Sequence, residues 1–196
     1  MAGIQGLGEQ PLLLGADAAR FFLYKPPGLT VFPPHRNPSL PSLLSFWEQQ
    51  PEFSIQAWPE GFAGGLAHRL DTGTGGLVLA ARTPEDLSVL RQQFSQQFLR
   101  KFYYFYSSGR LETSPLLTLP IAHHPRKKDR MVVQNHPGTA HRGKWYPAWT
   151  RFRSLGEGWW EAEIRTGVMH QVRVHAARAG LALEGDALYG GKPGSF

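Results

Sequence analysis

Cysteine is absent from this chain, and its absence removes two kinds of site. Neither a disulfide nor a thiolate-bound metal can form, so metal binding would depend on histidines and acids. Apolar runs are also short: none approaches the roughly 18 residues of a membrane span, and no basic segment followed by an apolar one opens the sequence. We therefore expect neither a signal peptide nor a membrane span, and we predict a cytoplasmic protein.

Acidic residues are fewer than basic ones, which biases the choice of partner. The 196 residues include 21 Lys and Arg against 15 Asp and Glu, a formal net charge of +6. This balance favours a polyanionic partner, although many ordinary enzymes share it. A hydrophobic content of 41% is enough for one sizeable core. We predict a single domain over residues 1–196.

One acid lies in an unusual setting. Asp71 is surrounded by glycines over residues 64–76 and is followed by the apolar run Leu77–Ala81, which predicts a buried strand. A catalytic carboxylate on the turn and an ordinary Asp turn beside Arg69 are both open interpretations of this pattern. No second acid has a comparable context, which disfavours a two-carboxylate glycosidase. The GxSxG and GxxxxGK signatures are missing as well.

Several further elements can be predicted from local patterns. Phe21–Tyr24 predicts a strand that ends at the rigid turn Lys25–Leu29, which would hold Lys25 in place. Ser39 is expected to cap a short helix with Leu40 and Trp47 on its buried face. The other expected elements are a loop over Gln50–Phe62, a helix capped by Thr83 with Leu87, Leu90, Phe94 and Phe98 on one face, and strands over Lys101–Tyr106, Gly158–Arg165 and Leu181–Leu183.

Basic and aromatic side chains are concentrated between His123 and Arg151. Seven cations stand here against one acid, Asp129. This mixture suits phosphate contacts combined with base stacking, and a solvated cationic hairpin is the alternative. The histidines lack ordinary zinc-ligand spacing, so we expect no metal. The cations are Arg126, Lys127, Lys128, Arg130, Arg142, Lys144 and Arg151.

The last helical pattern begins near Thr166, which we expect to be its cap, and runs to Ala179 before Gly180. It places His170 and Arg173 three residues apart on one face. An arginine on this helix is a candidate partner for the carboxylate of Asp71. Such a carboxylate, together with a facing tyrosine and a basic surface, indicates chemistry on a nucleotide.

The chain resembles the RluA-type pseudouridine synthases through four stretches in the same order. They are Tyr24–Leu29, His68–Leu77 with its His-Arg-Leu-Asp core, Lys101–Tyr103, and Thr166–His175 followed by Gly185–Gly190. The resemblance covers most of the chain. It implies an α+β fold built on a long, mostly antiparallel mixed sheet with flanking helices and a central cleft. It also implies an enzyme that needs no cofactor or metal and isomerises uridine in rRNA or tRNA, and we expect the protein to be a monomer.

The resemblance implies roles for individual residues. Asp71 would break the glycosidic bond, by attacking C1′ or removing the C2′ proton. Tyr103 would stack on the target base, Arg173 would pair with Asp71, and Arg69 would fill the gap left by the flipped nucleotide. The other expected substrate contacts are Lys25, His68, Leu70, Lys101, His170, Gln171, Arg126, Lys127 and Lys128.

Three departures from the family pattern accompany these matches. Gly75 stands where the family usually has serine, and Val168 and Met169 stand before His170 where the family usually has an Arg and a Thr or Lys, so one cationic substrate contact is missing. The chain stops soon after Tyr189, and the segment before Tyr24 is too short for the extra RNA-binding module of some relatives, so we expect none. These departures motivate an alternative function: a diverged RNA-binding protein of the same fold with little or no isomerase activity.

Overall fold

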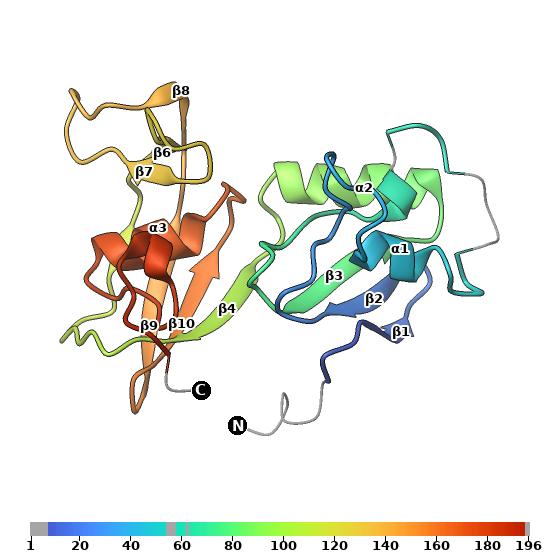
Figure 1. Ribbon diagram of the computed structural model, residues 1–196, viewed down its shortest axis with the longest axis horizontal. Coiled ribbons are helices and arrows are strands. Elements are labelled where there is room, and N and C mark those ends of the chain that lie inside the picture. The colour runs from blue at the N-terminus through green and yellow to red at the C-terminus, as the bar shows by residue number, and fades with distance from the viewer. Residues whose placement is uncertain (1–7, 54–57, 62, 195–196) are drawn as a thin grey trace. The chain divides into compact units, whose positions relative to one another are not determined.

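The computed structural model describes residues 8–53, 58–61 and 63–194, and the chain divides into two compact units, residues 1–93 and 94–196 (Figure 1). Every ladder between named strands in the described residues is antiparallel, and helices pack on the sheets. A mixed α/β fold with antiparallel sheets is therefore confirmed. The single-domain organisation stays a prediction. The predicted loop Gln50–Phe62 falls partly on 54–57 and 62, outside the described residues.

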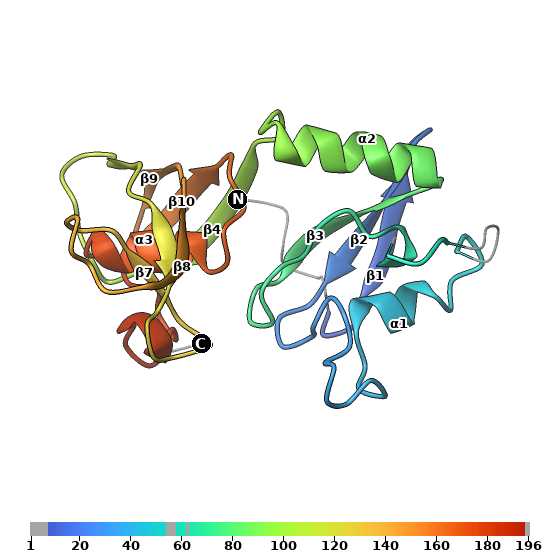
Figure 2. The same ribbon diagram turned by 90° about the horizontal axis from the view of Figure 1, so that it is seen from above.

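The first unit is built on a three-stranded sheet in the order β1 (Leu12–Ala16), β2 (Arg20–Lys25) and β3 (Gly76–Ala81). Phe21 and Leu23 of β2 stand opposite Ala80 and Val78 of β3, and all four side chains are buried. The ring of Trp47 from α1 (Leu43–Trp47) lies 4.9 Å from that of Phe21. Helix α1 therefore closes one face of this sheet (Figure 2).

Helix α2 (Pro84–Ser95) begins where the sequence predicts. The Thr83 hydroxyl accepts from the Asp86 backbone N–H at 3.1 Å, and two acids in the first turn favour the positive end of the helix dipole. Leu87 and Leu90 pack with Ala81. The predicted apolar face is wrong at Phe98, which lies beyond the helix end and is 73% exposed.

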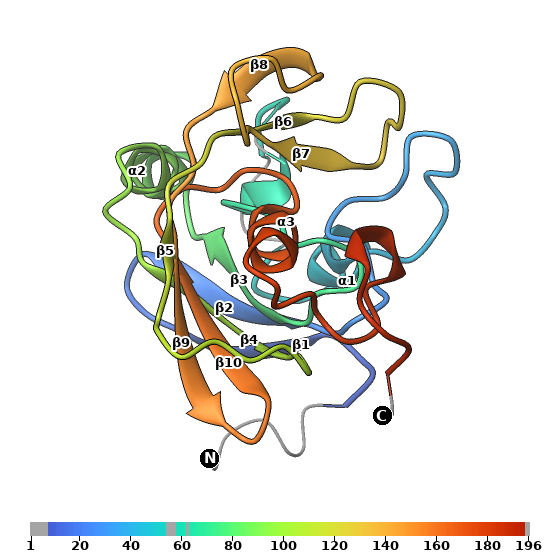
Figure 3. The same cartoon turned by 90° about the vertical axis from the view of Figure 1, so that its left-hand side faces the viewer.

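In the described residues, the second unit contains two sheets and the helix α3. One sheet has the order β4 (Lys101–Tyr106), β10 (Trp159–Ile164), β9 (Thr150–Gly156) and β5 (Leu116–Leu117). The other has the order β7 (Met131–Val133), β6 (Ile121–His123) and β8 (Arg142–Tyr146). Helix α3 (Gln171–Arg178) lies between the two sheets (Figure 3). The short 3-10 turns η1 (Ala63–Gly65) and η2 (Ala187–Tyr189) complete the described elements.

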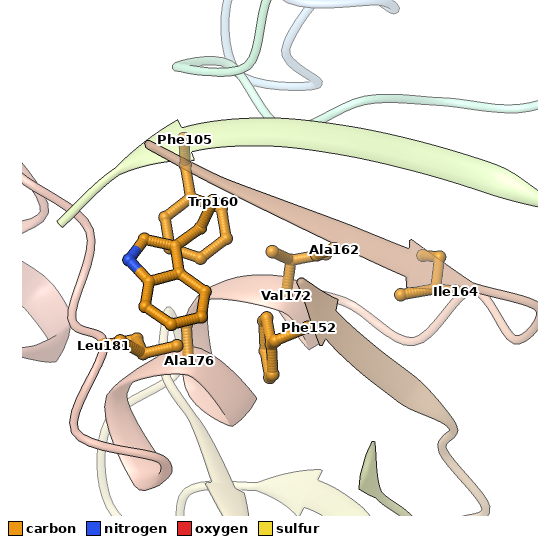
Figure 4. Close-up of a cluster of buried hydrophobic side chains, with 8 residues drawn as sticks. All are labelled: Phe105, Phe152, Trp160, Ala162, Ile164, Val172, Ala176 and Leu181. Carbon is orange, nitrogen blue, oxygen red and sulfur yellow. The ribbon is translucent and has the colours of Figure 1, made fainter. Parts of the chain in front are cut away.

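Helix α3 buries side chains in two directions. Val172 and Ala176 pack with Phe152 and Trp160 of the four-stranded sheet (Figure 4), and Val174 packs with the three-stranded one. The helix ends as predicted at Gly180, whose φ of 82° lets Leu181 N–H reach the Ala176 carbonyl. Its start was predicted wrongly, because α3 begins at Gln171 and His170, not Thr166, is its N-cap.

Other local predictions also needed correction. Ser42, not Ser39, caps α1 through a reciprocal bond with Ser45, and Leu40 is exposed. Leu77 is 47% exposed, so the run Leu77–Ala81 is buried only in part. The prediction missed β1 and all strands from β5 to β9, and residues 181–183 form no strand. Among the described residues no helix is long and apolar enough to cross a membrane.

Candidate active site

Asp71 lies on a turn that is bonded to the end of β2. Its carbonyl accepts from Thr74 N–H at 3.0 Å, and the carbonyl of Thr72 accepts from Gly28 N–H at 2.8 Å. The second bond joins the Asp71 turn to the Lys25–Leu29 turn. Asp71 itself is partly buried and Thr72 is exposed, so the acid stands at the edge of this unit.

Lys25 is the second connection between these turns. Its side chain is fully buried, and Nζ donates to the carbonyls of Pro26 at 2.9 Å, Leu29 at 2.7 Å and Thr72 at 3.2 Å. Burial lowers the pKa of this amine to about 8, although the negative charge of Asp71 acts in the opposite direction. Through these bonds the ammonium group holds the Lys25–Leu29 turn and the Asp71 turn together. The substrate contact predicted for Lys25 stays a prediction.

Gly75 has a physical reason to lack a side chain. A Cβ at this position would lie 2.9 Å from Cδ of Pro27, closer than real Cβ contacts come, and 3.1 Å from its Cγ, which is also tight. The proline ring therefore fills the space that a serine would need. This contact explains the first departure from the family pattern.

The residues before Asp71 differ in environment. The backbone N–H of Leu79 donates to His68 Nε2 at 3.2 Å, which ties the start of this stretch to β3. Leu70 is buried at 8% exposure, whereas Arg69 is exposed. Arg69 is predicted to fill the gap that a flipped nucleotide leaves in RNA, and its exposed position suits this role.

In the second unit, β4 supplies two predicted site residues on one face. Tyr103 packs against the core cluster around Phe152 and Trp160, on the same side of the strand as buried Phe105. Lys101 is partly buried, which lowers the pKa of its amine, and its Nζ lies 5.5 Å from the Phe94 ring centroid. The side of β4 predicted for Lys101, Tyr103 and Phe105 is confirmed.

Arg173 is held by a carboxylate that the sequence reasoning did not single out. Its Nε donates to Asp186 Oδ2 at 2.7 Å and its Nη2 to Oδ1 at 2.9 Å. The Asp186 side chain is only 8% exposed. The guanidinium also lies 5.1 Å from the Tyr189 ring centroid. The pairing of Arg173 with Asp71 stays a prediction.

Tyr189 connects three segments of the second unit. Its hydroxyl accepts from Met131 N–H at 2.8 Å and bonds His170 Nδ1 at 2.9 Å. Burial raises the pKa of this phenol to about 12, so it stays neutral. His170 has a φ of 55°, an uncommon conformation for a residue with a side chain, and stands directly before α3. The motif Asp186–Tyr189 in the sequence was the available signal for these contacts.

Gln171 is buried and organises the segment before α3. Its Nε2 donates to Trp149 O at 2.9 Å and to Thr150 Oγ1 at 3.1 Å. Its Oε1 accepts from the Thr166 hydroxyl at 2.8 Å and from Val168 N–H at 3.1 Å. The amide thus fixes the 166–168 loop to β9, and its predicted substrate contact stays a prediction.

Val168 and Met169 pack against the apolar cluster of Ile121, Met131 and Val174. They also line a cavity of about 440 Å³. Apolar packing therefore replaces the cationic contact that the family pattern places here. The other lining residues are Phe94, Ser95, Gln97, His123, Met131, Tyr146, Pro147, Thr166 and Gly167.

The predicted basic contacts Arg126, Lys127 and Lys128 occupy the exposed loop between β6 and β7. His124 Nδ1 accepts from the backbone N–H groups of Arg126 and Lys127, both at 3.1 Å, and so shapes the loop. Within the described part of the chain no group of three or more His, Cys, Asp or Glu could hold a metal ion.

This chain belongs to the RNA pseudouridylate synthase family, whose model matches residues 20–178. It is 33% identical over 183 residues to the ribosomal large subunit pseudouridine synthase D of Nitrosomonas europaea, covering 91% of this chain and 49% of that protein. It is 34% identical over 133 residues to the chloroplastic RNA pseudouridine synthase 2 of Oryza sativa subsp. japonica, covering 65% of this chain and 29% of that protein. The chain thus spans at most about half the length of these two relatives.

Solved structures support the same fold at lower identity. Human RNA Pseudouridylate Synthase Domain Containing 1 matches with a TM-score of 0.71 at 17% identity, over 93% of this chain and 70% of that one. Human RNA Pseudouridylate Synthase Domain Containing 4 matches with a TM-score of 0.69 at 19% identity, over 90% and 68%. At such identities the likeness concerns the fold.

Proposed function

We propose that this protein isomerises uridine to pseudouridine in RNA and that Asp71 is the catalytic carboxylate. The observation that carries the proposal is the anchoring of the Asp71 turn by Lys25 and Gly28, within the matched family region. A carboxylate that is fixed before the substrate binds loses little further freedom when it reacts, so its orientation lowers the barrier.

In the proposed reaction, Asp71 cleaves the bond between C1′ and N1 of the target uridine, by attack on C1′ or by removal of the C2′ proton. The freed uracil rotates and bonds to C1′ through C5, and the C5 proton leaves as N1 gains one. Tyr103 stacks on the base and assists removal of the C5 proton, and Arg173 pairs with Asp71. The reaction is an isomerisation, so it consumes no co-reactant.

We further propose that the exposed loop with Arg126, Lys127 and Lys128 contacts RNA phosphates. Flipping a nucleotide costs a few kcal/mol, which such backbone contacts offset. If about five phosphates of a single strand are neutralised, the slope of log affinity against log salt should be near −3.5. A slope near zero would exclude this loop as the RNA contact.

The relative from Nitrosomonas europaea is named for the large ribosomal subunit, so large-subunit rRNA is the first substrate to test, with tRNA as the second. The monomeric state, the cytoplasmic location and the independence of metal belong to the same proposal.

The test compares wild-type protein with Asp71→Asn on transcribed rRNA fragments and tRNA, with pseudouridine mapped by carbodiimide-dependent primer-extension stops. Wild-type protein should create stops, and Asp71→Asn should remove them while RNA affinity persists. Glu112→Gln, at an exposed loop position, is the matched control. A wild-type protein that binds RNA but creates no stop would favour the alternative of an RNA-binding protein without turnover.

A further inference from the structure

One face of the four-stranded sheet is not used by the proposed reaction. Alternation along β4 directs Tyr103 and Phe105 to the core that α3 covers, so Phe102 and Tyr104 project from the opposite face. These two aromatic side chains are 43% and 53% exposed. Figure 4 shows the packed cluster on the α3 side of the sheet. We call the opposite side, with Phe102, Tyr104, Arg151, Arg153, Glu161 and Glu163, the outer sheet face.

Strand register arranges this face in two rows. Phe102 stands opposite Glu163, which stands opposite Arg151 on the next strand. Tyr104, Glu161 and Arg153 form the second row in the same way. Each row therefore presents a ring, a carboxylate and a guanidinium, side by side on three neighbouring strands.

The carboxylates hold arginines in place. Arg153 donates to Glu161 through Nε at 3.1 Å and Nη2 at 3.0 Å, and Arg100 Nε donates to Glu163 at 2.7 Å. Both glutamates are nearly buried, whereas the Arg100 and Arg153 side chains are 56% and 61% exposed. These guanidiniums are therefore fixed at one end and open to solvent, and they retain donors for a further anion.

The outer sheet face has a net positive charge, which favours an anionic partner. Four arginines meet two glutamates here, since Arg165 also approaches Glu163 at 3.9 Å and Arg151 follows it in the row. The Arg100 guanidinium lies 5.0 Å from the Phe102 ring centroid. A hollow of about 300 Å³ lies among Arg100, Phe102, Arg151, Arg153, Glu161 and Glu163. An excess of cations around exposed rings matches the phosphates and bases of a single strand.

We propose that the outer sheet face binds an unpaired RNA strand that flanks the modified segment, with bases stacked on Phe102 and Tyr104 and phosphates on Arg151 and Arg153. The inference rests on the proposed function only in taking RNA as the partner. A neutral peptide would leave the excess arginines without counter-charges, so it fits the face less well.

The experiment compares two RNAs that contain the same target stem-loop, one of them with an unpaired extension of about ten nucleotides. Wild-type protein should bind the extended RNA about tenfold more tightly. The double variant Phe102→Ala/Tyr104→Ala should remove this difference, because each stacked base contributes measurably to single-strand affinity. Phe98→Ala, an equally drastic change at a 73% exposed ring outside this face, is the control and should keep the difference.

Arg151→Gln adds a second measurement, since losing one phosphate contact should make the salt slope for the extended RNA less negative by about 0.7. Thermal melts confirm that each variant is folded. Equal affinity of the double variant and wild type for the extended RNA would overturn the proposal. So would a variant that dissociates a dimer without changing RNA affinity, because the face would then bind a second copy of this chain.

The outcomes also separate this inference from the proposed function. Turnover on the minimal stem-loop should be unchanged in Phe102→Ala/Tyr104→Ala and lost in Asp71→Asn. If wild-type protein produces no pseudouridine but keeps an extension-dependent affinity that the double variant loses, the outer sheet face is supported while the proposed activity fails. If wild-type protein produces pseudouridine but binds both RNAs equally well, the proposed activity is supported and the outer sheet face is not.

Discussion

Arg173 and Asp186 form a two-point ion pair, with N···O distances of 2.7 and 2.9 Å, thirteen residues apart in the sequence. Two parallel bonds fix both the position and the plane of the guanidinium. Asp186 is thus a positioning residue for the arginine that we expect beside Asp71.

Replacing Asp186 with Asn should lower kcat at least tenfold with little change in KM, because a small misplacement of a catalytic group costs rate more than binding. Stability should fall by about 2–4 kcal/mol, since the arginine loses the negative charge of Asp186 from a two-point ion pair. Asp186→Glu should recover part of the kcat. Steady-state kinetics and urea unfolding measure both effects, with Glu112→Gln as control; a proportional loss of stability and activity in Asp186→Glu would indicate a merely structural acid.

Lys25 should show its burial in the pH dependence of stability. Its folded pKa of about 8 lies below the ordinary 10.5, so the unfolded chain binds more protons between these values. The contribution of Lys25 to the free energy of unfolding should therefore rise from pH 8 to pH 10.5. Urea unfolding of wild type and Lys25→Met across this range measures it as a widening difference.

At pH 7, Lys25→Met should cost about 2 kcal/mol because the carbonyls of Pro26 and Leu29 lose the Lys25 donor and the Thr72 carbonyl is left with Gly28 N–H. Exposed Lys144→Met should show neither effect. If the difference in unfolding free energy between wild type and Lys25→Met does not change with pH, the lowered pKa of the Lys25 amine is contradicted.

The contact between Gly75 and Pro27 predicts that Gly75→Ser destabilises the protein by about 1–3 kcal/mol, since the new Cβ meets a rigid ring. Pro27→Ala in the same chain should return part of this loss. Gly73→Ser is the control, because a Cβ there meets nothing within 4 Å. Denaturant unfolding of wild type, Gly75→Ser, Pro27→Ala and the double variant tests the coupling, and additive effects of the two single changes would refute it.

His175 should make the protein sensitive to mild acid. It is fully buried, and because its Nε2 bonds the Leu119 carbonyl, Nε2 carries the proton and Nδ1 accepts from the Thr150 hydroxyl. Burial lowers the pKa of the imidazole below its ordinary value of 6.5. Between the folded pKa and 6.5 the unfolded state therefore binds more protons than the folded state. Stability should fall as the pH drops below 6.5.

Unfolding monitored from pH 7.5 to 5 should show a decline that His175→Gln reduces, while exposed His136→Gln keeps the wild-type slope. A His175→Gln protein that declines as steeply as wild type would assign the acid sensitivity to other groups.

Local chemistry explains why parts of this fold follow from the sequence. The Thr83 cap and the Gly180 stop involve residues a few positions apart, so the pattern alone contains them. The alternation of Lys101–Tyr106 likewise predicts which side of β4 is buried. The start of α3 did not follow, because the Thr166 hydroxyl bonds the Gln171 side chain and no longer caps a helix.

Some features of the candidate site likewise follow from the sequence, and others depend on distant contacts. Asp71 stands out through its glycine-rich turn, whereas the role of Lys25 depends on the Thr72 carbonyl, 47 residues away. β1 was missed because it is an edge strand with mostly exposed side chains and leaves little apolar pattern. Asp186 lies outside α3, so no helical spacing connects it with Arg173.

The Tyr189 hydroxyl joins the strand that follows the basic loop, at Met131, to the residue that precedes α3, at His170. A local opening that frees one of these segments must break the same junction for the other. Amide exchange at Met131 should thus occur in the same opening event as exchange at the first turn of α3. The loop that we propose contacts RNA and the helix that carries Arg173 should then open as one cooperative unit, because both depend on the hydroxyl of Tyr189.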